Sequence, residues 1–305
     1  MTHLVSIRDL GREEIASLFR LAADLKAKRK AGDRSTPLTG RTLALVFEKP
    51  SLRTRVTFEV AMVHLGGRAI YLSANEIGLG VRESVPDVAR NLGRWVDVIA
   101  ARTLRHATVE GLARHAGIPV VNGLSDLEHP CQALADFFTL WERGWDLARI
   151  RVAWIGDGNN VCHSIMLLSA LTGASVAVAC PPGYEPQPAI QAACRELGGR
   201  FSITPDPRQA AEGADVLYTD VWISMGQEAE RELRLEAFQR YQVNDTLVGF
   251  AKPSAVVMHC LPAHRGEEIT DAVVDGPRSL VLEQAENRLH LQKALLVALL
   301  GASDV

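Results

Sequence analysis

An arginine-rich motif at the start of a predicted helix is the first candidate for chemistry. The stretch SLRTR places Arg53 and Arg55 in the opening turn, directly after Ser51, a residue type that suits the N-cap. Cations at a helix N-terminus oppose the macrodipole, at a cost of about 0.3–1 kcal/mol each. A bound phosphate would offset that cost, because it accepts hydrogen bonds from free N–H groups and from guanidinium groups. The motif therefore predicts an anion site, with a solvated, Ser-capped surface helix as the alternative.

The two arginines of this motif are expected to differ in role. They lie about 200° apart around a helix, so they cannot both point at one ligand. Arg53 is the predicted phosphate ligand, supported by the hydroxyl groups of Ser51 and Thr54. Arg55 can instead pair with Glu59, four residues further along the chain. Val56, Val60 and Val63 line up on one face of the same amphipathic helix.

Other polar side chains follow apolar runs elsewhere in the chain. Arg102 ends the run VDVIAAR, and His129 precedes Pro130 and Gln132. Arg102 could be a second cation near the anion site, and His129 could donate a hydrogen bond to a carbonyl group of a substrate. Asp220 follows an apolar run in the second half, where a carboxylate would suit an amine. Ordinary structural roles compete with each of these interpretations: a solvated arginine, a structural histidine and a turn-capping aspartate.

Two motifs in the second half resemble catalytic patterns but fail on spacing. WIGDGNN lacks the third glycine of a dinucleotide fingerprint, because Val161 holds that position, and no acid ends the next strand. NAD is therefore not expected; Asn160 could offer its amide to a polar ligand while Asn159 makes the turn. Cys260 follows His259, but strand alternation places this histidine on the opposite face. The spacing thus supports neither thiol catalysis nor a metal site.

Strand and helix patterns alternate along the chain and predict a parallel α/β fold. The polar motifs follow the apolar runs, where ligands bind in such sheets. The alternation restarts after a helix at 130–143, which predicts two parallel-sheet α/β domains of similar size. A final helix, at about 285–300, is expected to pack back on the first domain. The predicted boundaries give a first domain of 1–132 plus 286–305 and a second domain of 133–285.

Composition restricts the class of protein. The 305 residues include 33 basic and 36 acidic side chains, a balance that disfavours general nucleic-acid or membrane-surface binding. No apolar run approaches the ~20 residues of a membrane span. Five scattered cysteines fit a reducing compartment, and the N-terminus lacks the pattern of a signal peptide. We therefore expect a cytoplasmic protein without nucleic-acid or membrane partners.

Taken together, the motifs resemble those of the aspartate/ornithine carbamoyltransferase family in order and spacing, over nearly the whole chain. They are SLRTR, HPCQ, GDGNN, DVWISMGQE and HCLPAHRGEEI. The resemblance implies transfer of a carbamoyl group from carbamoyl phosphate to L-ornithine, which gives L-citrulline and phosphate in arginine biosynthesis. It also implies that no metal or organic cofactor takes part, and that the chain forms a homotrimer or a multiple of trimers.

The resemblance further implies which residues bind and react. The catalytic groups would be Arg102, His129, Asp220 and Cys260. Carbamoyl phosphate would be bound by Ser51, Leu52, Arg53, Thr54, Arg102, His129, Gln132, Cys260, Leu261 and Arg288. Ornithine would be bound by Asn160, Asp220, Ser224 and Met225. One departure concerns a loop that reaches the phosphate of a neighbouring subunit: Gly78 stands where the family has Gln, and Arg82 is a candidate replacement.

Three alternatives remain open from the sequence. The same transfer could use another acceptor, such as N-acetylornithine, putrescine or aspartate. The chain could be a nucleotide-binding oxidoreductase, which the missing glycine and acid disfavour. It could also be a non-catalytic homologue that has kept the fold, although the motif positions other than Gly78 are filled.

Overall fold

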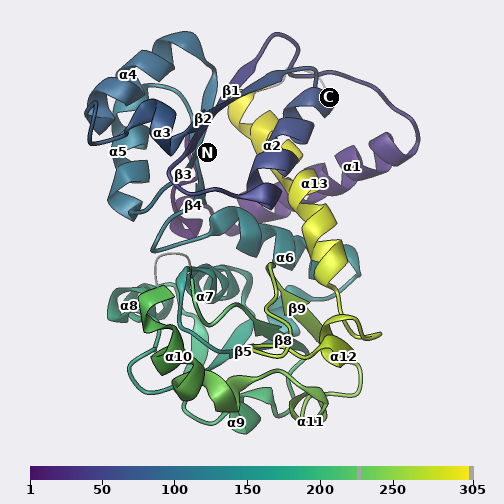
Figure 1. Cartoon of the computed structure of the whole chain (residues 1–305). Coiled ribbons are helices and arrows are strands. Elements are labelled where there is room, and N and C mark those ends of the chain that lie inside the picture. Colours follow the sequence, from purple (N-terminus) through teal and green to yellow (C-terminus); the bar gives the residue numbers. More distant parts are fainter. Residues whose placement is uncertain (225–227, 302–305) are drawn as a thin grey trace. The chain divides into compact units, whose positions relative to one another are not determined.

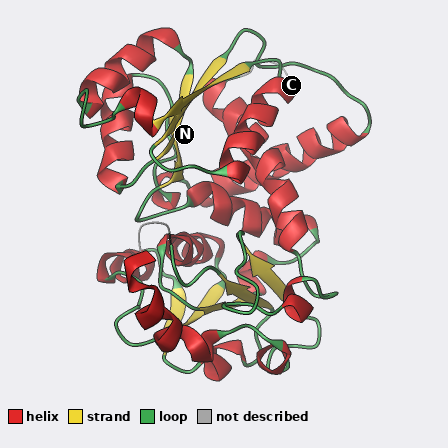
Figure 2. Cartoon of the chain, in the orientation of Figure 1, coloured by secondary structure: helices red, strands yellow, loops and turns green. Residues whose placement is uncertain are grey.

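The computed structural model describes residues 1–224 and 228–301, which fold into two α/β units (Figures 1 and 2). One unit comprises Met1–Phe138 with Glu286–Val305, and the other comprises Thr139–Ala285. The first boundary, between Phe138 and Thr139, falls inside helix α6 (Pro130–Glu142), which also contains residue 132, where the sequence places the boundary. The second falls inside helix α13 (Val281–Leu300). No helix among the described residues is long and apolar enough to cross a membrane.

The first unit is built on a four-stranded parallel sheet in the order β2-β1-β3-β4. The strands are β1 (Thr42–Phe47), β2 (Arg68–Ser73), β3 (Val98–Arg102) and β4 (Val120–Leu124). Apolar runs such as TLALVF form the central strands because helices cover both faces of such a sheet. Register places Phe47 beside Arg102, so β1 and β3 end together. The loops after these two strands therefore leave the sheet at one edge.

Helices of the first unit cover the two faces of this sheet. Figure 1 shows α4 (Val85–Trp95) and α5 (His106–Ala116) on one side, and α1 (Arg12–Lys30) and α2 (Leu52–His64) on the other. The remaining helices are η1 (Ile7–Asp9), α3 (Ala74–Ile77) and part of α6. The C-terminal helix α13 packs back on this unit, as predicted, with Leu291, Ala294 and Leu295 buried. A hydrogen bond of 2.8 Å from Lys26 Nζ to Asn287 Oδ1 links it to α1.

The face of α2 that carries the valines is not the buried one. Val56 and Val63 are 44% and 68% exposed, whereas Phe58, Ala61 and Met62 are fully buried. The helix has apolar side chains on more than one side, so periodicity alone does not identify its inner face. The exposed valines leave an apolar stripe on the surface of the first unit.

The second unit contains a five-stranded parallel sheet in the order β7-β6-β5-β8-β9. Its strands are β5 (Arg151–Ile155), β6 (Ser175–Ala179), β7 (Arg200–Thr204), β8 (Val216–Thr219) and β9 (Val256–His259). Its helices are η2 (Leu147–Arg149), α7 (Asn160–Thr172), α8 (Pro188–Glu196), α9 (Pro207–Ala211), η3 (Glu228–Glu230), α10 (Arg231–Phe238), η4 (Gln239–Tyr241), α11 (Asp245–Val248) and α12 (Asp271–Val274). The order of the strands reverses between β5 and β8, where ligands bind in folds of this type. The predicted parallel α/β fold is thus confirmed in both units.

Close packing of α4 against α5 supplies a test of the first unit. A methyl group added at Gly93 would lie 1.8 Å from the carbonyl oxygen of Ala116, so the backbones would have to separate. We expect Gly93→Ala to reduce the free energy of unfolding by about 1–3 kcal/mol. The matched control is Gly111→Ala in α5, whose methyl group would meet the movable Val85 side chain at 3.0 Å. Thermal unfolding should show a lower Tm for Gly93→Ala alone, and equal Tm values would contradict the packing.

Candidate active site

The first unit contains a group of three arginines and one histidine, called here the arginine cluster: Arg53, Arg102, His129 and Arg288. Arg53 lies at the N-terminus of α2. Ser51 is the N-cap, and its Oγ accepts a hydrogen bond of 3.3 Å from the backbone N–H of Thr54. Leu52 is 74% exposed, so any contact with an anion at this N-terminus would come from its backbone N–H. Arg53 is half-buried in the same turn.

Arg55 has the separate role that its spacing predicts. Its Nε donates to Glu59 Oε1 at 2.9 Å, which confirms the predicted pair. Its guanidinium carbon also lies 3.8 Å from the centre of the Tyr71 ring. These two contacts hold Arg55 on the outer side of the helix. The two arginines of the motif are therefore not equivalent.

Arg102 and His129 are buried polar side chains of the first unit. Arg102 ends β3 and is 8% exposed, and His129 directly precedes α6 and is 5% exposed. Burial lowers the pKa of His129 well below its ordinary value, and the charges of Arg288, Arg102 and Arg53 lower it further, in that order. The imidazole is thus neutral at neutral pH. A neutral imidazole among three guanidinium groups can donate one hydrogen bond from its N–H to a carbonyl oxygen, while the arginines bind an anion.

Arg288 is held in place by two side chains from distant parts of the sequence. Its Nη1 donates to Gln132 Oε1 at 2.7 Å, and its Nη2 donates to Thr54 Oγ1 at 2.8 Å. Gln132 in turn donates from Nε2 to Asp136 Oδ1 at 2.8 Å. The hydrogen bonds that Arg288 donates to Thr54 and Gln132 therefore fix the orientation of its guanidinium group. Asp136 was not predicted from the sequence, although it lies four residues after Gln132 on one helix, a spacing that brings two side chains together.

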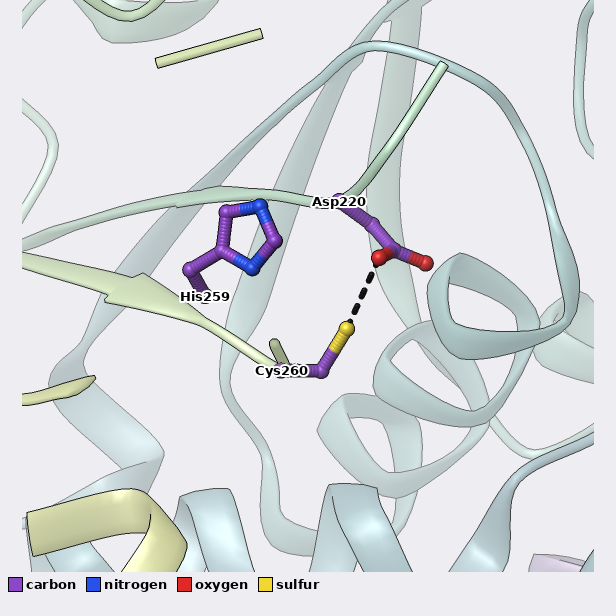
Figure 3. Close-up of side chains that lie close together, drawn as sticks. All are labelled: Asp220, His259 and Cys260. Carbon is purple, nitrogen blue, oxygen red and sulfur yellow. Dashed lines mark hydrogen bonds between the residues drawn. The ribbon is translucent and has the colours of Figure 1, made fainter. Parts of the chain in front are cut away.

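In the second unit, Asp220 and Cys260 meet where β8 and β9 end (Figure 3). Cys260 Sγ donates to Asp220 Oδ1 at 2.9 Å, and the same oxygen accepts from the backbone N–H of Val221 at 2.8 Å. Asn159 Nδ2 donates to Asp220 Oδ2 at 2.8 Å. Both carboxylate oxygens are thus oriented by donors, and Asp220 is only 7% exposed.

The two asparagines of GDGNN divide their roles. Asn159 is the N-cap of α7, and its Oδ1 accepts from the backbone N–H groups of Val161 and Cys162 at 3.0 and 3.1 Å. The turn role expected for Asn159 is confirmed, but its bond to Asp220 was not predicted. Asn160 begins α7 and is half-buried. It follows β5, on the other side of the strand-order reversal from Asp220.

The prediction that His259 points away from Cys260 is wrong. Asp220, His259 and Cys260 each place a polar atom within 4.8 Å of the others. Strand alternation does not reach Cys260, because β9 ends at His259 and the chain then turns through Leu261, whose φ is +61°. The His259 ring is nevertheless engaged elsewhere: Nδ1 accepts from Leu261 N at 2.9 Å, and Nε2 contacts Glu268 Oε1 at 3.1 Å. It is therefore not available as a base for the thiol.

Arg234, which was not predicted from the sequence as a site residue, holds the loop after β8 in place. Arg234, 3% exposed, donates from Nε to the carbonyl of Trp222 at 2.8 Å and forms an ion pair with Asp157 of the GDGNN motif. Burial raises the pKa of Asp157, and this effect exceeds the lowering by Arg234. Ser224, half-buried, ends the described part of the loop, and Met225 lies outside the described residues.

Comparisons with known proteins match the chain in two consecutive parts, and the second part includes residues 286–299 of α13, which belong to the first unit. The family model described as "Aspartate/ornithine carbamoyltransferase, carbamoyl-P binding domain" matches residues 2–142. The model described as "Aspartate/ornithine carbamoyltransferase, Asp/Orn binding domain" matches residues 148–299. Both units of the chain are therefore similar to units of one family, in the same order.

Individual relatives match over nearly their whole length. The ornithine carbamoyltransferase of Methanosarcina acetivorans is 53% identical over 297 residues, which cover 97% of this chain and 98% of the relative. The crystal structure of ornithine carbamoyltransferase from Thermus thermophilus has a TM-score of 0.89 at 52% identity, with 98% and 99% coverage. The structure of ornithine carbamoyltransferase from Pyrococcus furiosus has a TM-score of 0.95 at 50% identity, with 99% and 98% coverage.

The environment of His129 yields a prediction about pH. An unfolded chain binds a proton on this residue at about pH 6.5, whereas the folded chain stays neutral there because its pKa is lowered. Its contribution to stability is therefore complete above pH ~6.5 and is lost as the pH falls below that value. In an NMR titration of the ligand-free protein, the imidazole signals absent from His129→Gln should not shift from about pH 8 to about pH 6. A midpoint within that range would contradict the burial of a neutral ring.

Proposed function

Because the chain belongs to the aspartate/ornithine carbamoyltransferase family, we propose that it is an ornithine carbamoyltransferase. It transfers the carbamoyl group of carbamoyl phosphate to the δ-amine of L-ornithine, giving L-citrulline and phosphate in arginine biosynthesis. One observation carries the proposal: Arg102, His129 and Arg288 are buried in one unit, and Arg288 is held by Thr54 and Gln132. Burial, and then the charges of these arginines and Arg53, lower the pKa of His129, which lies in the part of the chain that matches the carbamoyl-P binding model. A doubly charged phosphate next to a carbonyl group is the ligand that suits such a cluster.

The donor's two ends would be bound by different groups. The phosphate would accept hydrogen bonds from Ser51, Arg53 and the first backbone N–H groups of α2, including those of Leu52 and Thr54. The carbamoyl group would lie against the remaining predicted contacts: Arg102, His129, Gln132, Arg288, Cys260 and Leu261. Arg288 donates hydrogen bonds to Thr54 and Gln132, which fix its guanidinium group and support a preformed electrophilic site.

The acceptor would be recognised by the second unit, which matches the Asp/Orn binding model. Asp220 suits the α-ammonium group of ornithine, because its carboxylate is held by Asn159, Val221 and Cys260. Asn160 and Ser224 would contact the rest of the amino-acid head group, and Met225 is a further predicted contact. Cys260 would orient the δ-amine with a neutral sulfur rather than attack the donor.

The proposed reaction is an addition followed by an elimination. The neutral δ-amine of ornithine attacks the carbamoyl carbon and forms a C–N bond, and negative charge develops on the carbonyl oxygen. Arg102 and His129 stabilise that charge. The C–O bond to phosphate then breaks, and the leaving phosphate accepts the proton that the amine loses. Holding both substrates in line would supply much of the rate.

Assembly and location extend the proposal. We propose a homotrimer or a multiple of trimers, supported by the apolar stripe that Val56 and Val63 form on α2. Gly78 has a φ of +55° and ends α3, where a Cβ would meet Arg82 Cβ at 2.8 Å, so a glycine suits this turn. Arg82 would then supply the polar contact that the family's glutamine makes. A cytoplasmic location remains a prediction from the cysteine pattern.

The acceptor is tested by direct assay. Purified protein with carbamoyl phosphate and L-ornithine should form citrulline, measured colorimetrically, and ornithine should give the highest kcat/KM in a panel with N-acetylornithine, putrescine and aspartate. A higher value for another member of the panel would replace ornithine as the acceptor. The absence of any carbamoylated product would reject the transferase.

A matched pair of arginine variants tests the donor site. Arg53→Ala should lower kcat/KM for carbamoyl phosphate by about 100-fold or more, because a charge that stabilises the phosphate is lost. Arg55→Ala, two residues away, removes a guanidinium that is held by Glu59 and Tyr71 and should change the rate only severalfold. Circular dichroism should show both variants folded. Equal losses in the two variants would mean that Arg53 does not bind the phosphate.

A further inference from the structure

Three side chains with metal-binding chemistry meet in the loop that follows β9, apart from the residues assigned to the substrates. His264, Glu267 and Glu268 each offer one ligand atom, and these atoms all lie within 4.8 Å of one another. Two hydrogen bonds within the loop hold these residues together: His264 N donates to the side-chain Oε1 of Glu268 at 2.5 Å, and Glu267 N donates to the carbonyl of His264 at 2.9 Å. The three ligand atoms are therefore gathered by one short segment of chain.

Each of the three residues carries one buried atom that finds no hydrogen-bond partner within residues 1–224 and 228–301. These atoms are His264 Nδ1, Glu267 Oε2 and Glu268 Oε2. Buried polar atoms normally have partners, because an unsatisfied one costs free energy. His264 Nδ1 and Glu267 Oε2 are 3.6 Å apart, which is too long for a hydrogen bond. It is close to the ~3.4 Å that separates two tetrahedral ligands bound to a metal at about 2.0–2.2 Å.

Protein contacts already engage the other oxygen of each carboxylate. Glu267 Oε1 pairs with Arg231, and Glu268 Oε1 contacts His259 Nε2 and His264 N. Such contacts orient metal-binding carboxylates in known sites. Glu268 is fully buried, whereas the side chains of His264 and Glu267 are 41% and 24% exposed. An ion could therefore enter from solvent on the side of His264 and keep water as a further ligand.

We propose that His264, Glu267 and Glu268 bind a divalent transition-metal cation of the Zn²⁺ or Co²⁺ type. One imidazole nitrogen with two carboxylate oxygens suits these ions better than Ca²⁺ or Mg²⁺, which prefer oxygen ligands alone. Two carboxylates beside one arginine also leave negative charge for a cation to neutralise. The site goes beyond the carbamoyl transfer proposed above and does not depend on it.

The neighbouring group of Asp220, His259 and Cys260 is the competing location. Its atoms also lie within 4.8 Å of one another, but both nitrogens of His259 are engaged, by Leu261 N and Glu268. Asp220 likewise has donors on both oxygens. A cation there would have to break several hydrogen bonds. The loop cluster requires no such loss, so the geometry favours it.

The experiment is a metal titration of the full chain after removal of metals with a chelator. Calorimetry with ZnCl₂ should show one site per chain, and His264→Ala should weaken binding by at least about tenfold. His115→Ala, on α5 of the first unit, is the matched control and should bind as the parent does. Glu267→Gln repeats the test without removing the imidazole, and the melting curve of each variant checks that it folds.

Two further measurements separate the loop cluster from the competing location. Cys260→Ser should leave the Zn²⁺ affinity unchanged, and the absorption spectrum of the Co²⁺-loaded protein should contain no thiolate-to-cobalt charge-transfer band. The proposal is overturned if His264→Ala binds like the parent, if Cys260→Ser abolishes binding, or if millimolar ZnCl₂ produces no binding at all. These readouts contain no catalytic step, so a failed citrulline assay would leave them intact.

Discussion

The burial of guanidinium groups, which costs free energy of hydration, is the constraint that the first unit has to satisfy. Arg102 and Arg288 are almost wholly buried. Burial of His129, and then their charges and that of Arg53, lower the pKa of this histidine. Desolvated cations raise the free energy of the fold unless fixed partners or a ligand compensate them. Bonds from Arg288 to Thr54 and Gln132 supply part of that compensation and fix its geometry. A phosphate that binds to such a cluster meets charges that are already in position.

Parallel topology explains how these groups come to be where chemistry can occur. In both units, candidate site residues lie at the carboxyl ends of strands: Arg102 ends β3, Asp220 follows β8 and Cys260 follows β9. Adjacent parallel strands end at the same edge, so residues far apart in sequence become neighbours there. The distance from Asp220 to Cys260 is set by the pairing of β8 with β9 rather than by any local motif.

Sequence patterns predict those features that are local. The strands and helices follow from the period of the apolar residues, and the Arg55–Glu59 pair follows from helix spacing. The bonds from Asn159 to Asp220 and from Arg288 to Thr54 join residues 61 and 234 positions apart, so no local rule predicts them. The prediction that His259 and Cys260 point to opposite faces failed for a different, local reason. It extended strand alternation one residue beyond the end of β9, which ends at His259.

Three donors bind the carboxylate of Asp220 before any ligand arrives. A thiol and an amide N–H occupy one oxygen, and the side chain of Asn159 occupies the other. Because a carboxylate oxygen can accept two hydrogen bonds, an incoming ammonium group can bind Oδ2 without displacing Asn159. The bonds already present fix the orientation of the carboxylate. A ligand therefore meets an acceptor that does not have to turn to receive it.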